Sequence, residues 1–393
     1  MPIEMKGGYQ KMRKTRIPLF AALLTVCMIL AVGVTYSAAE VSPYIYQYDD
    51  MFTKRDLKQA ADLTDSAEYV VSDGQDIHIA AAGVYVLTGT AKDVTVYVEA
   101  GKDDKVQLVL DGLRITNDDV PAVYVKTADK VFITVSGDSA LSVTQAFDSG
   151  DKADGVIYSK SDLVLNGTAT LTINSVKNGI VGKDDLKITS GSYIVAAADK
   201  AIEANDSIRI ADGVLDLAAG TDGLHAENSD DDSLGYIYIA GGSITIQAQD
   251  DAIHATSVVQ INDGKLTIAG SEGIEGTYIQ LNGGTISING RDDGINAGQK
   301  SKSYRTKIEI NGGSITVVMA SGDTDGIDSN GDIVVNGGTI DVTGSSSFDY
   351  DGSAEYNGGT IIVNGQQLSY IPNQMMGGGR GGRGGWGGWG KRQ

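Results

Sequence analysis

Short runs of alternating apolar and polar residues recur along most of this chain. Typical examples are Ile208-Arg209-Ile210, Ile244-Thr245-Ile246 and Ile308-Glu309-Ile310. Alternation with a period of two places the apolar side chains on one face of an extended strand. Turn residues separate the runs, which agrees with a composition of 52 glycines and only 5 prolines. The pattern therefore predicts an all-β protein built from many short strands and tight turns.

The runs are grouped into a repeated unit of roughly 21–24 residues, a period typical of solenoid folds. Each unit opens with a small residue, an apolar residue, a variable residue and a second small residue, and it holds three short strands. The openings begin at positions 122, 155, 179, 201, 223, 252, 273, 294 and 326. Successive units keep one register, and no two-residue hairpin joins neighbouring strands. We therefore expect a single-stranded parallel β-helix of about ten coils.

A turn of the type Asn-Gly-Gly follows the second strand in several units. The asparagines of these turns are Asn282, Asn311, Asn336 and Asn357. Asparagine tolerates left-handed backbone angles and bonds to neighbouring backbone. In a stack of coils these side chains are expected to bond to one another as a ladder.

Two units are longer than the rest because they carry polar insertions at 228–235 and 298–307. Both insertions follow the first strand of their coil, so they are expected on the same side of the β-helix. Insertions gathered on one face of a repeat protein often mark its binding face.

The N-terminal residues 1–39 have the pattern of an export signal. Basic residues between Lys11 and Arg16 precede an apolar run at 17–34, and small residues follow at 37–39. We expect cleavage after Ala39; the alternative is an uncleaved segment 17–34 that anchors the protein in a membrane. Cys27 is the only cysteine, so no disulfide forms within the chain. Val26 precedes it where lipidation requires a small residue, which disfavours a lipid anchor.

The remaining boundaries follow from where the repeat begins and ends. Residues 40–75 are predicted to be a linker and cap, with a short helix at 52–61 that covers the edge of the first coil. The β-helix is predicted for 76–365. Residues 366–393, which are rich in Gly, Arg and Trp, are predicted to be a disordered tail because they cannot bury a core.

The formal net charge of −20 excludes nucleic acid as a partner, because such binding requires Lys and Arg to neutralise phosphates. An acidic surface of this size points to cations or serves solubility alone.

The acidic side chains are concentrated at two positions of the unit, the turn before the first strand and the outward position of that strand. Stacking the units would place like charges roughly 5 Å apart, which is unfavourable unless a cation intervenes. Oxygen-rich sites of flexible geometry suit Ca²⁺. The predicted calcium ligands are Asp222, Asp250, Asp251, Glu272, Glu275, Asp292, Asp293, Asp325 and Asp328. For any single Asp-Gly pair, ordinary turn chemistry stays the alternative.

Two histidines and an asparagine, His225, His254 and Asn296, occupy the same outward position as these acids. Histidine is a poor calcium ligand, so these residues are predicted either to bond a sugar or to lie on the surface without a ligand. The tyrosines Tyr236, Tyr238 and Tyr278 alternate with inward isoleucines and are expected to face outward, where they would stack on sugar rings or simply favour a strand. Zinc is not expected, since the chain has 3 histidines and no usable cysteine.

Several stretches resemble a family of exported bacterial carbohydrate-binding proteins. They are 83–90, 106–116 and 122–126, together with 52–57 and the recurring Asp-Gly-Ile/Leu and Asn-Gly-Gly units, so the resemblance extends from about 52 to 365. The resemblance implies a right-handed parallel β-helix similar to polysaccharide lyases, binding of cellulose-like and acidic polysaccharides, and calcium on the surface. It assigns calcium most directly to Asp222, Asp251, Asp293 and Asp325. Glu272 replaces the aspartate in one coil, and Lys200 interrupts the row in another.

The preferred function is therefore an exported, secreted or cell-surface protein that binds polysaccharide without catalysis. Bound Ca²⁺ would reverse the charge of the acidic face and bridge it to acidic sugars. The first alternative is a calcium-dependent lyase of the pectate type, with Arg291, Lys300 or Arg305 as the base. No convergent pair identifies a catalytic residue. The second alternative is a structural or adhesive rod, and nothing in the sequence indicates the oligomeric state.

Overall fold

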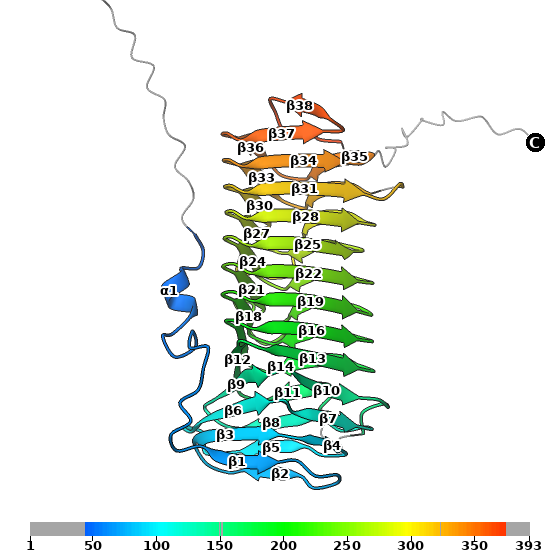
Figure 1. Cartoon of the computed structure of the whole chain (residues 1–393). Helices are drawn as coiled ribbons and strands as arrows, with labels where there is room; N and C mark the ends of the chain where they lie inside the picture. The colour runs from blue at the N-terminus through cyan, green and yellow to red at the C-terminus, as the bar shows by residue number, and fades with distance from the viewer. Residues whose placement is uncertain (1–43, 149, 151, 323, 375–393) are drawn as a thin grey trace, which may run out of the picture. The chain divides into compact units, whose positions relative to one another are not determined.

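The computed structural model describes residues 44–148, 150, 152–322 and 324–374. These residues form a parallel β-helix in which a coil contributes one strand to each of three sheets (Figure 1). The fold class predicted from the sequence is confirmed. We number the sheets 1, 2 and 3 in the order in which the chain passes through them along a coil.

Sheet 1 comprises β2 (Ile77–Ile79), β5 (Val96–Glu99), β8 (Val123–Thr127), β11 (Gly155–Ser159), β14 (Asn178–Gly182), β17 (Ile202–Ala204), β20 (Leu224–Ala226), β23 (Ile253–Ala255), β26 (Ile274–Gly276), β29 (Asp293–Ala297), β32 (Asp325–Ser329) and β35 (Ser346–Tyr350).

Sheet 2 comprises β1 (Ala67–Val70), β3 (Gly83–Thr88), β6 (Lys105–Asp111), β9 (Lys130–Gly137), β12 (Asp162–Gly167), β15 (Asp185–Ile188), β18 (Ser207–Ile210), β21 (Tyr236–Ile239), β24 (Val258–Ile261), β27 (Tyr278–Leu281), β30 (Lys307–Ile310), β33 (Asp332–Val335) and β36 (Ala354–Tyr356).

Sheet 3 comprises β4 (Thr90–Lys92), β7 (Arg114–Asn117), β10 (Ser139–Val143), β13 (Thr170–Ser175), β16 (Ser192–Ala197), β19 (Val214–Ala219), β22 (Ser243–Ala248), β25 (Lys265–Gly270), β28 (Thr285–Gly290), β31 (Ser314–Met319), β34 (Thr339–Thr343), β37 (Thr360–Val363) and β38 (Gln366–Leu368). The last strand, β38, folds back antiparallel on β37 and ends the ladder of this sheet.

The described stack is longer than the ten or so coils expected, since sheets 2 and 3 have 13 strands each within the described residues and sheet 1 has 12. The first coils and the last one contribute the additional strands, because their sequences lack the regular Gly-Ile openings. Inward residues of all three sheets form one continuous apolar core, in which Ile253 pairs with Leu224 below and Ile274 above. Burial of these repeated aliphatic rows holds neighbouring coils together.

The expected asparagine ladder runs along one corner of the coils. Asn282 donates to Asn262 at 2.8 Å, Asn311 to Asn282 at 2.7 Å and Asn336 to Asn311 at 2.7 Å. The second glycine of each turn has a positive φ, for example 88° at Gly313, which favours glycine over other residues. A Cβ atom at that position would lie 2.9 Å from backbone atoms of the preceding coil, so the close stacking of turns also requires glycine.

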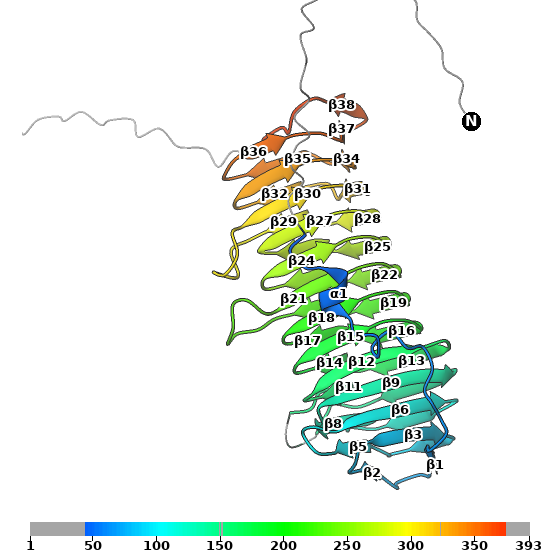
Figure 2. The same cartoon turned by 90° about the vertical axis from the view of Figure 1, so that its left-hand side faces the viewer.

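A segment that precedes the coils, residues 44–61, lies along the outer face of sheet 2, and we call it the N-terminal strap. Figures 1 and 2 show it beside the middle coils, with the short helix α1 (Tyr48–Met51) against them. The predicted helix at 52–61 is wrong: these residues are not helical and do not cover the first coil. Thr53 and Asp56 instead close a turn in which each backbone N–H bonds to the other's side chain. The β-helix begins at β1, within the segment predicted to be a linker.

The export signal predicted for 1–39 lies outside the described residues, as do residues 375–393 of the predicted tail. The prediction of a disordered tail from 366 onward is wrong at its start, because 366–368 form β38 and Ile371 is buried. Within the described part of the chain, none of the helices has the length and apolar character needed to cross a membrane.

Candidate functional site: the acidic face of sheet 1

One outward position of sheet 1 stays in register through the stack. In order along the coils it carries His78, Tyr97, Tyr124, Tyr158, Val181, Glu203, His225, His254, Glu275, Asn296, Asp328 and Asp349. The acids of the preceding turns, such as Asp293 and Asp325, stack beside this column. The structure thus brings the acidic residues selected from the sequence onto one face.

In the middle of the face, His254 lies between two carboxylates. Its Nδ1 atom is 2.9 Å from Asp251 Oδ2 and 2.6 Å from Glu275 Oε2. Lys300, from the second insertion, places its Nζ 2.6 Å from the other oxygen of Glu275. We call Asp251, His254, Glu275 and Lys300 the His254 cluster. Its first three members form a group whose possible ligand atoms all lie within 4.8 Å of one another.

The His254 cluster supplies its own positive charge. Burial disfavours the imidazolium, but the hydrogen bonds to Asp251 and Glu275 outweigh it and raise the pKa of His254 to about 9. For Glu275, burial acts against the charge, yet the bonds to His254 and Lys300 lower its pKa. Burial, together with the neighbouring Glu275, raises the pKa of Asp251. An imidazolium and an ammonium group thus lie against these carboxylates and offset their charge.

His225 continues the column one coil below. Its ring stacks on that of His254, with centroids 4.6 Å apart and planes inclined by 14°. The Nδ1 atom lies 2.8 Å from Asp222 Oδ2, and Nε2 lies 3.2 Å from Glu227 Oε2. Burial works against the charge of Asp222, but the contact with His225 lowers its pKa below the usual range. Asp222 is therefore engaged by a histidine rather than stacked against bare carboxylates.

The next coils toward the C-terminus differ, because β29 and β32 bring four oxygen-bearing side chains together that have no Lys, Arg or His partner among the described residues. These are Asp293 and Asn296 on one coil and Asp325 and Asp328 on the next, and we call them the acidic patch. Their Cα atoms pair across the sheet, Asp293 with Asp325 and Asn296 with Asp328. Two buried atoms, Asn296 Oδ1 and Asp325 Oδ1, accept no hydrogen bond within the described residues.

Burial and repulsion together raise the pKa values of Asp293 and Asp328. Burial is the largest cause at Asp293, and the charges of Asp328, Asp292 and Asp325 add to it, so that the pKa reaches about 7. At Asp328, burial and the charges of Asp349 and Asp325 raise the pKa to about 6. Among the described residues, no salt bridge links a patch carboxylate to a Lys, Arg or His. Carboxylate and amide oxygens are the ligands that Ca²⁺ prefers.

The other predicted calcium ligands are placed differently. Asp250 and Asp292 are exposed at their turns. Glu272 accepts a hydrogen bond of 3.0 Å from the amide of Asn296. Its pKa is raised to about 8, first by burial and then by the charges of Glu275 and Asp251. Glu272 thus connects the His254 cluster with the acidic patch.

The expectation of a tyrosine surface for sugar stacking is wrong for Tyr236 and Tyr238. Both point outward from sheet 2, as predicted, but the N-terminal strap covers them and leaves 6% and 0% of their surface exposed. The ring of Tyr46 in the strap stacks on Tyr236 with centroids 4.4 Å apart. Tyr278 is half-buried at the edge of the same cluster, where its hydroxyl bonds to Glu309. Sheet 2 therefore offers no exposed row of these rings.

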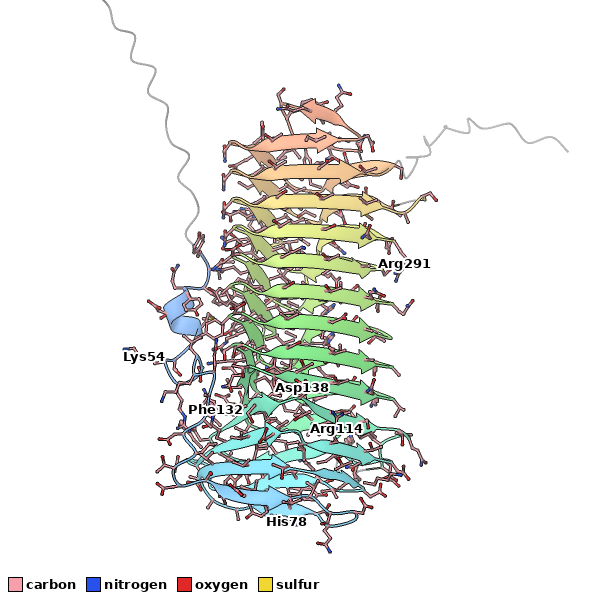
Figure 3. All side chains as sticks on the ribbon, in the orientation of Figure 1. Lys54, His78, Arg114, Phe132, Asp138 and Arg291 are labelled. Carbon is pink, nitrogen blue, oxygen red and sulfur yellow. The ribbon has the colours of Figure 1, made fainter. Side chains whose placement is uncertain are left out.

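The two insertions meet on one side of the coils, as expected (Figure 2). Ser301 Oγ of the second donates to the backbone oxygen of Asp232 in the first, at 2.5 Å. The three basic residues considered as a lyase base do not converge. Lys300 joins the His254 cluster, Arg305 pairs with Asp332, and Arg291 donates to the backbone oxygen of Gln249 at 2.6 Å. Figure 3 shows Arg291 at the edge where β28 ends, beside sheet 3.

The sequence reasoning missed Asp349, which pairs with Asp328 and extends the acidic column by one coil. Its coil opens with Ser346-Ser347-Phe348 instead of a Gly-Ile motif, so the repeat pattern did not include it. Spacing from the preceding turn and the alternation around Phe348 are the signals that place Asp349 in the outward position.

Comparisons with known proteins agree with this architecture. A relative from Acetivibrio thermocellus, named carbohydrate-binding domain-containing protein, is 35% identical over 130 residues, which are 31% of this chain. The match spans 46% of that relative, so the chain aligns with about half of its length. A solved structure, described as a polysaccharide lyase-like protein from C. thermocellum in a gadolinium derivative, has a TM-score of 0.51 and 30% identity. It covers 56% of this chain and 96% of its own. A family model described as carbohydrate-binding domain-containing protein matches residues 73–324 and 270–368. The chain therefore belongs to the family of carbohydrate-binding domain-containing proteins.

Proposed function

We propose that this is an exported, non-catalytic protein that binds acidic polysaccharide through Ca²⁺ held on the acidic face of sheet 1. Membership of a carbohydrate-binding family supports the polysaccharide. The charge of −20 supports the ion, because an acidic face repels an acidic glycan unless a cation lies between them. The basic and apolar pattern of residues 1–39 supports export, with a retained anchor at 17–34 as the alternative.

The acidic patch is the proposed calcium site. The observation that carries this choice is the pair of buried oxygens, Asn296 Oδ1 and Asp325 Oδ1, which accept no hydrogen bond within the described residues. A buried acceptor without a donor is costly, and a cation removes that cost. Binding would require the patch side chains to turn toward the ion, because the tightly gathered group on this face is the His254 cluster.

The contrast within the face explains why the ion is placed there. The carboxylates of Asp251 and Glu275 already face His254 and Lys300, so a metal ion would have to displace two positive groups. The carboxylates of Asp293, Asp325 and Asp328 repel one another. A divalent cation is therefore most favourable at β29 and β32. Its remaining coordination positions would be open to the carboxylates of a bound uronate chain.

The contact between Lys300 and Glu275 argues against Lys300 as the base of an elimination. A base that removes a proton from a sugar carbon must itself be uncharged. Burial disfavours the charge of Lys300, but the bond to Glu275 outweighs it and raises its pKa, which holds the ammonium charged at neutral pH.

Titration of the full-length protein with polygalacturonate, in Ca²⁺ and in chelator, tests the proposal. We expect binding in Ca²⁺ only, without growth of the ultraviolet absorbance of unsaturated products. Asp293→Asn and Asp325→Asn should each weaken calcium binding roughly 10–100-fold. Asp263→Asn, at an exposed turn, is the matched control and should bind like the wild type. Equal binding by all four proteins would overturn the calcium site, and growing absorbance would make the protein a lyase.

A further inference from the structure

A recess of about 250 Å³ lies on sheet 1 where β17 and β20 meet the first insertion. The residues that line it include Glu203 and His225 from the outward position of the two strands and Lys200 from the turn before β17. The insertion contributes Asn228, Ser229 and Asp230 to the lining. This volume is below the range of pockets for drug-sized ligands, so it suits a small unit such as one sugar ring.

The wall made by the insertion is fixed by its own hydrogen bonds. Asn228 donates to Asp206 Oδ1 at 2.7 Å and accepts the backbone N–H groups of Asp230 and Asp231 at 2.9 and 2.8 Å. The contact between Ser301 and the backbone of Asp232 ties the same loop to the second insertion. The recess is therefore formed before any ligand binds, which reduces the ordering cost of binding.

The charges around the recess select against an anionic ligand. Three carboxylates border it, those of Glu203, Glu227 and Asp230, against the single ammonium group of Lys200 among its lining residues. Lys200 Nζ lies 3.8 Å from Glu203, which Lys183 also contacts at 2.7 Å from outside the recess. A carboxylate accepts hydroxyl donors strongly, and an ammonium group donates to a hydroxyl oxygen. The chemistry fits a ring rich in hydroxyl groups and without charge.

We propose that this recess binds one uncharged, hydroxyl-rich sugar unit, at a subsite distinct from the acidic patch. The proposal rests on the proposed polysaccharide-binding function and names a second unit that the face recognises. β20 lies three coil steps before β29, which is roughly 15 Å at the strand spacing of a sheet. One chain lying along sheet 1 therefore reaches both subsites. Sheet 1 then selects a polymer that carries neutral units together with uronates.

The test fills the recess and leaves the acidic patch unchanged. Ser229→Trp places a large side chain at the exposed lining position. Ser233→Trp, at an exposed position of the same loop outside the recess, is the matched control. Lys200→Met is a second variant, which removes the donor without filling the space. Each full-length protein is titrated with a soluble neutral glucan and with polygalacturonate, both in Ca²⁺ and in chelator.

We expect the wild type to bind the neutral glucan with or without Ca²⁺. Ser229→Trp should weaken this binding about tenfold or more, since it removes the contacts of a whole sugar ring. Lys200→Met should weaken it less, and Ser233→Trp should leave it unchanged. Binding of polygalacturonate in Ca²⁺ should persist in all variants. If polygalacturonate binds but the glucan does not, or both recess variants bind glucan like the wild type, the subsite is overturned and the proposed function stands. If neither polymer binds the wild type, both proposals fail.

Discussion

The carboxylate of Asp56 in the N-terminal strap lies 3.1 Å from the ammonium group of Lys187, which is 131 residues further along the chain. The side chain of Asp56 is 1% exposed and that of Lys187 is 6% exposed. Lys130 Nζ lies 3.8 Å from the same carboxylate. Burial opposes the charge of Asp56, but the N–H of Thr53 and the two lysines outweigh it and hold its pKa below the usual range. This pair attaches the strap to sheet 2.

Replacing Asp56 tests how strongly the strap stabilises the coils. Asp56→Ala leaves Lys187 buried without its carboxylate partner and should lower the free energy of unfolding by about 3–5 kcal/mol. Denaturant unfolding followed by circular dichroism measures the change. Asp50→Ala, at an exposed strap position, serves as control. Combining Asp56→Ala with Lys187→Met should recover part of the loss, and an unchanged midpoint for Asp56→Ala would contradict the role of the pair.

Asparagine ladders stabilise the corner between sheets 2 and 3. Asn311→Ala removes the bond from Asn311 to Asn282 and the one from Asn336 to Asn311, and leaves both partners unsatisfied. We expect a loss of about 1–3 kcal/mol in the free energy of unfolding. Asn289→Ala, at an exposed position near the end of β28, should have no measurable effect. Equal stability of the two variants would mean that water replaces the ladder bonds without cost.

The His254 cluster makes stability depend on pH. The folded protein raises the pKa of His254 from 6.5 to about 9, so the imidazolium stabilises the folded state. This contribution is fully present below 6.5 and is lost as the pH rises toward 9. The unfolding midpoint in urea, measured across that window, should fall with rising pH in the wild type and fall less in His254→Gln. His78→Gln, which removes an exposed imidazole, should keep the wild-type slope; a flat wild-type profile would contradict the cluster.

Protons should compete with calcium at the acidic patch. Repulsion and burial raise the pKa of Asp293 to about 7 and that of Asp328 to about 6, so both carboxyl groups take up protons within a mildly acidic range. Calcium binding requires the deprotonated form. Calorimetric titrations should therefore show an affinity that falls as the pH is lowered through 7 and 6. The dependence should weaken in Asp328→Asn, and an affinity that is constant over this range would place the ion elsewhere.

Ligand binding should also raise the stability of the folded chain. At a calcium concentration of about 100 times the dissociation constant, the gain amounts to about 2.7 kcal/mol. Thermal unfolding in Ca²⁺ and in chelator measures it, and Asp325→Asn should abolish most of the difference. A shift that survives in both Asp293→Asn and Asp325→Asn would show that calcium stabilises the protein from another site.

The coil and the outward column of sheet 1 follow from the repeat pattern alone. A period-two strand pattern repeated at a nearly constant spacing leaves few arrangements that bury every apolar row, and a parallel stack fixes the register at the same time. Glu203, His225, His254 and Asp328 therefore share one outward position as soon as the coils stack. The same periodicity places the two insertions on one side of the coils and aligns the turn asparagines as a ladder.

The partners of these side chains, in contrast, depend on contacts between segments that are far apart in the chain. The strap covers Tyr236 and Tyr238 although almost 200 residues separate them from Tyr46, and no local pattern records such a contact. Likewise, Lys300 reaches Glu275 through an irregular insertion, while no Lys, Arg or His of the described chain forms a salt bridge with Asp293 or Asp325. Periodicity specifies the face on which a side chain lies. Whether an oppositely charged group lies beside that side chain depends on the loops and segments that fold over the coils. These loops and segments lie outside the repeat.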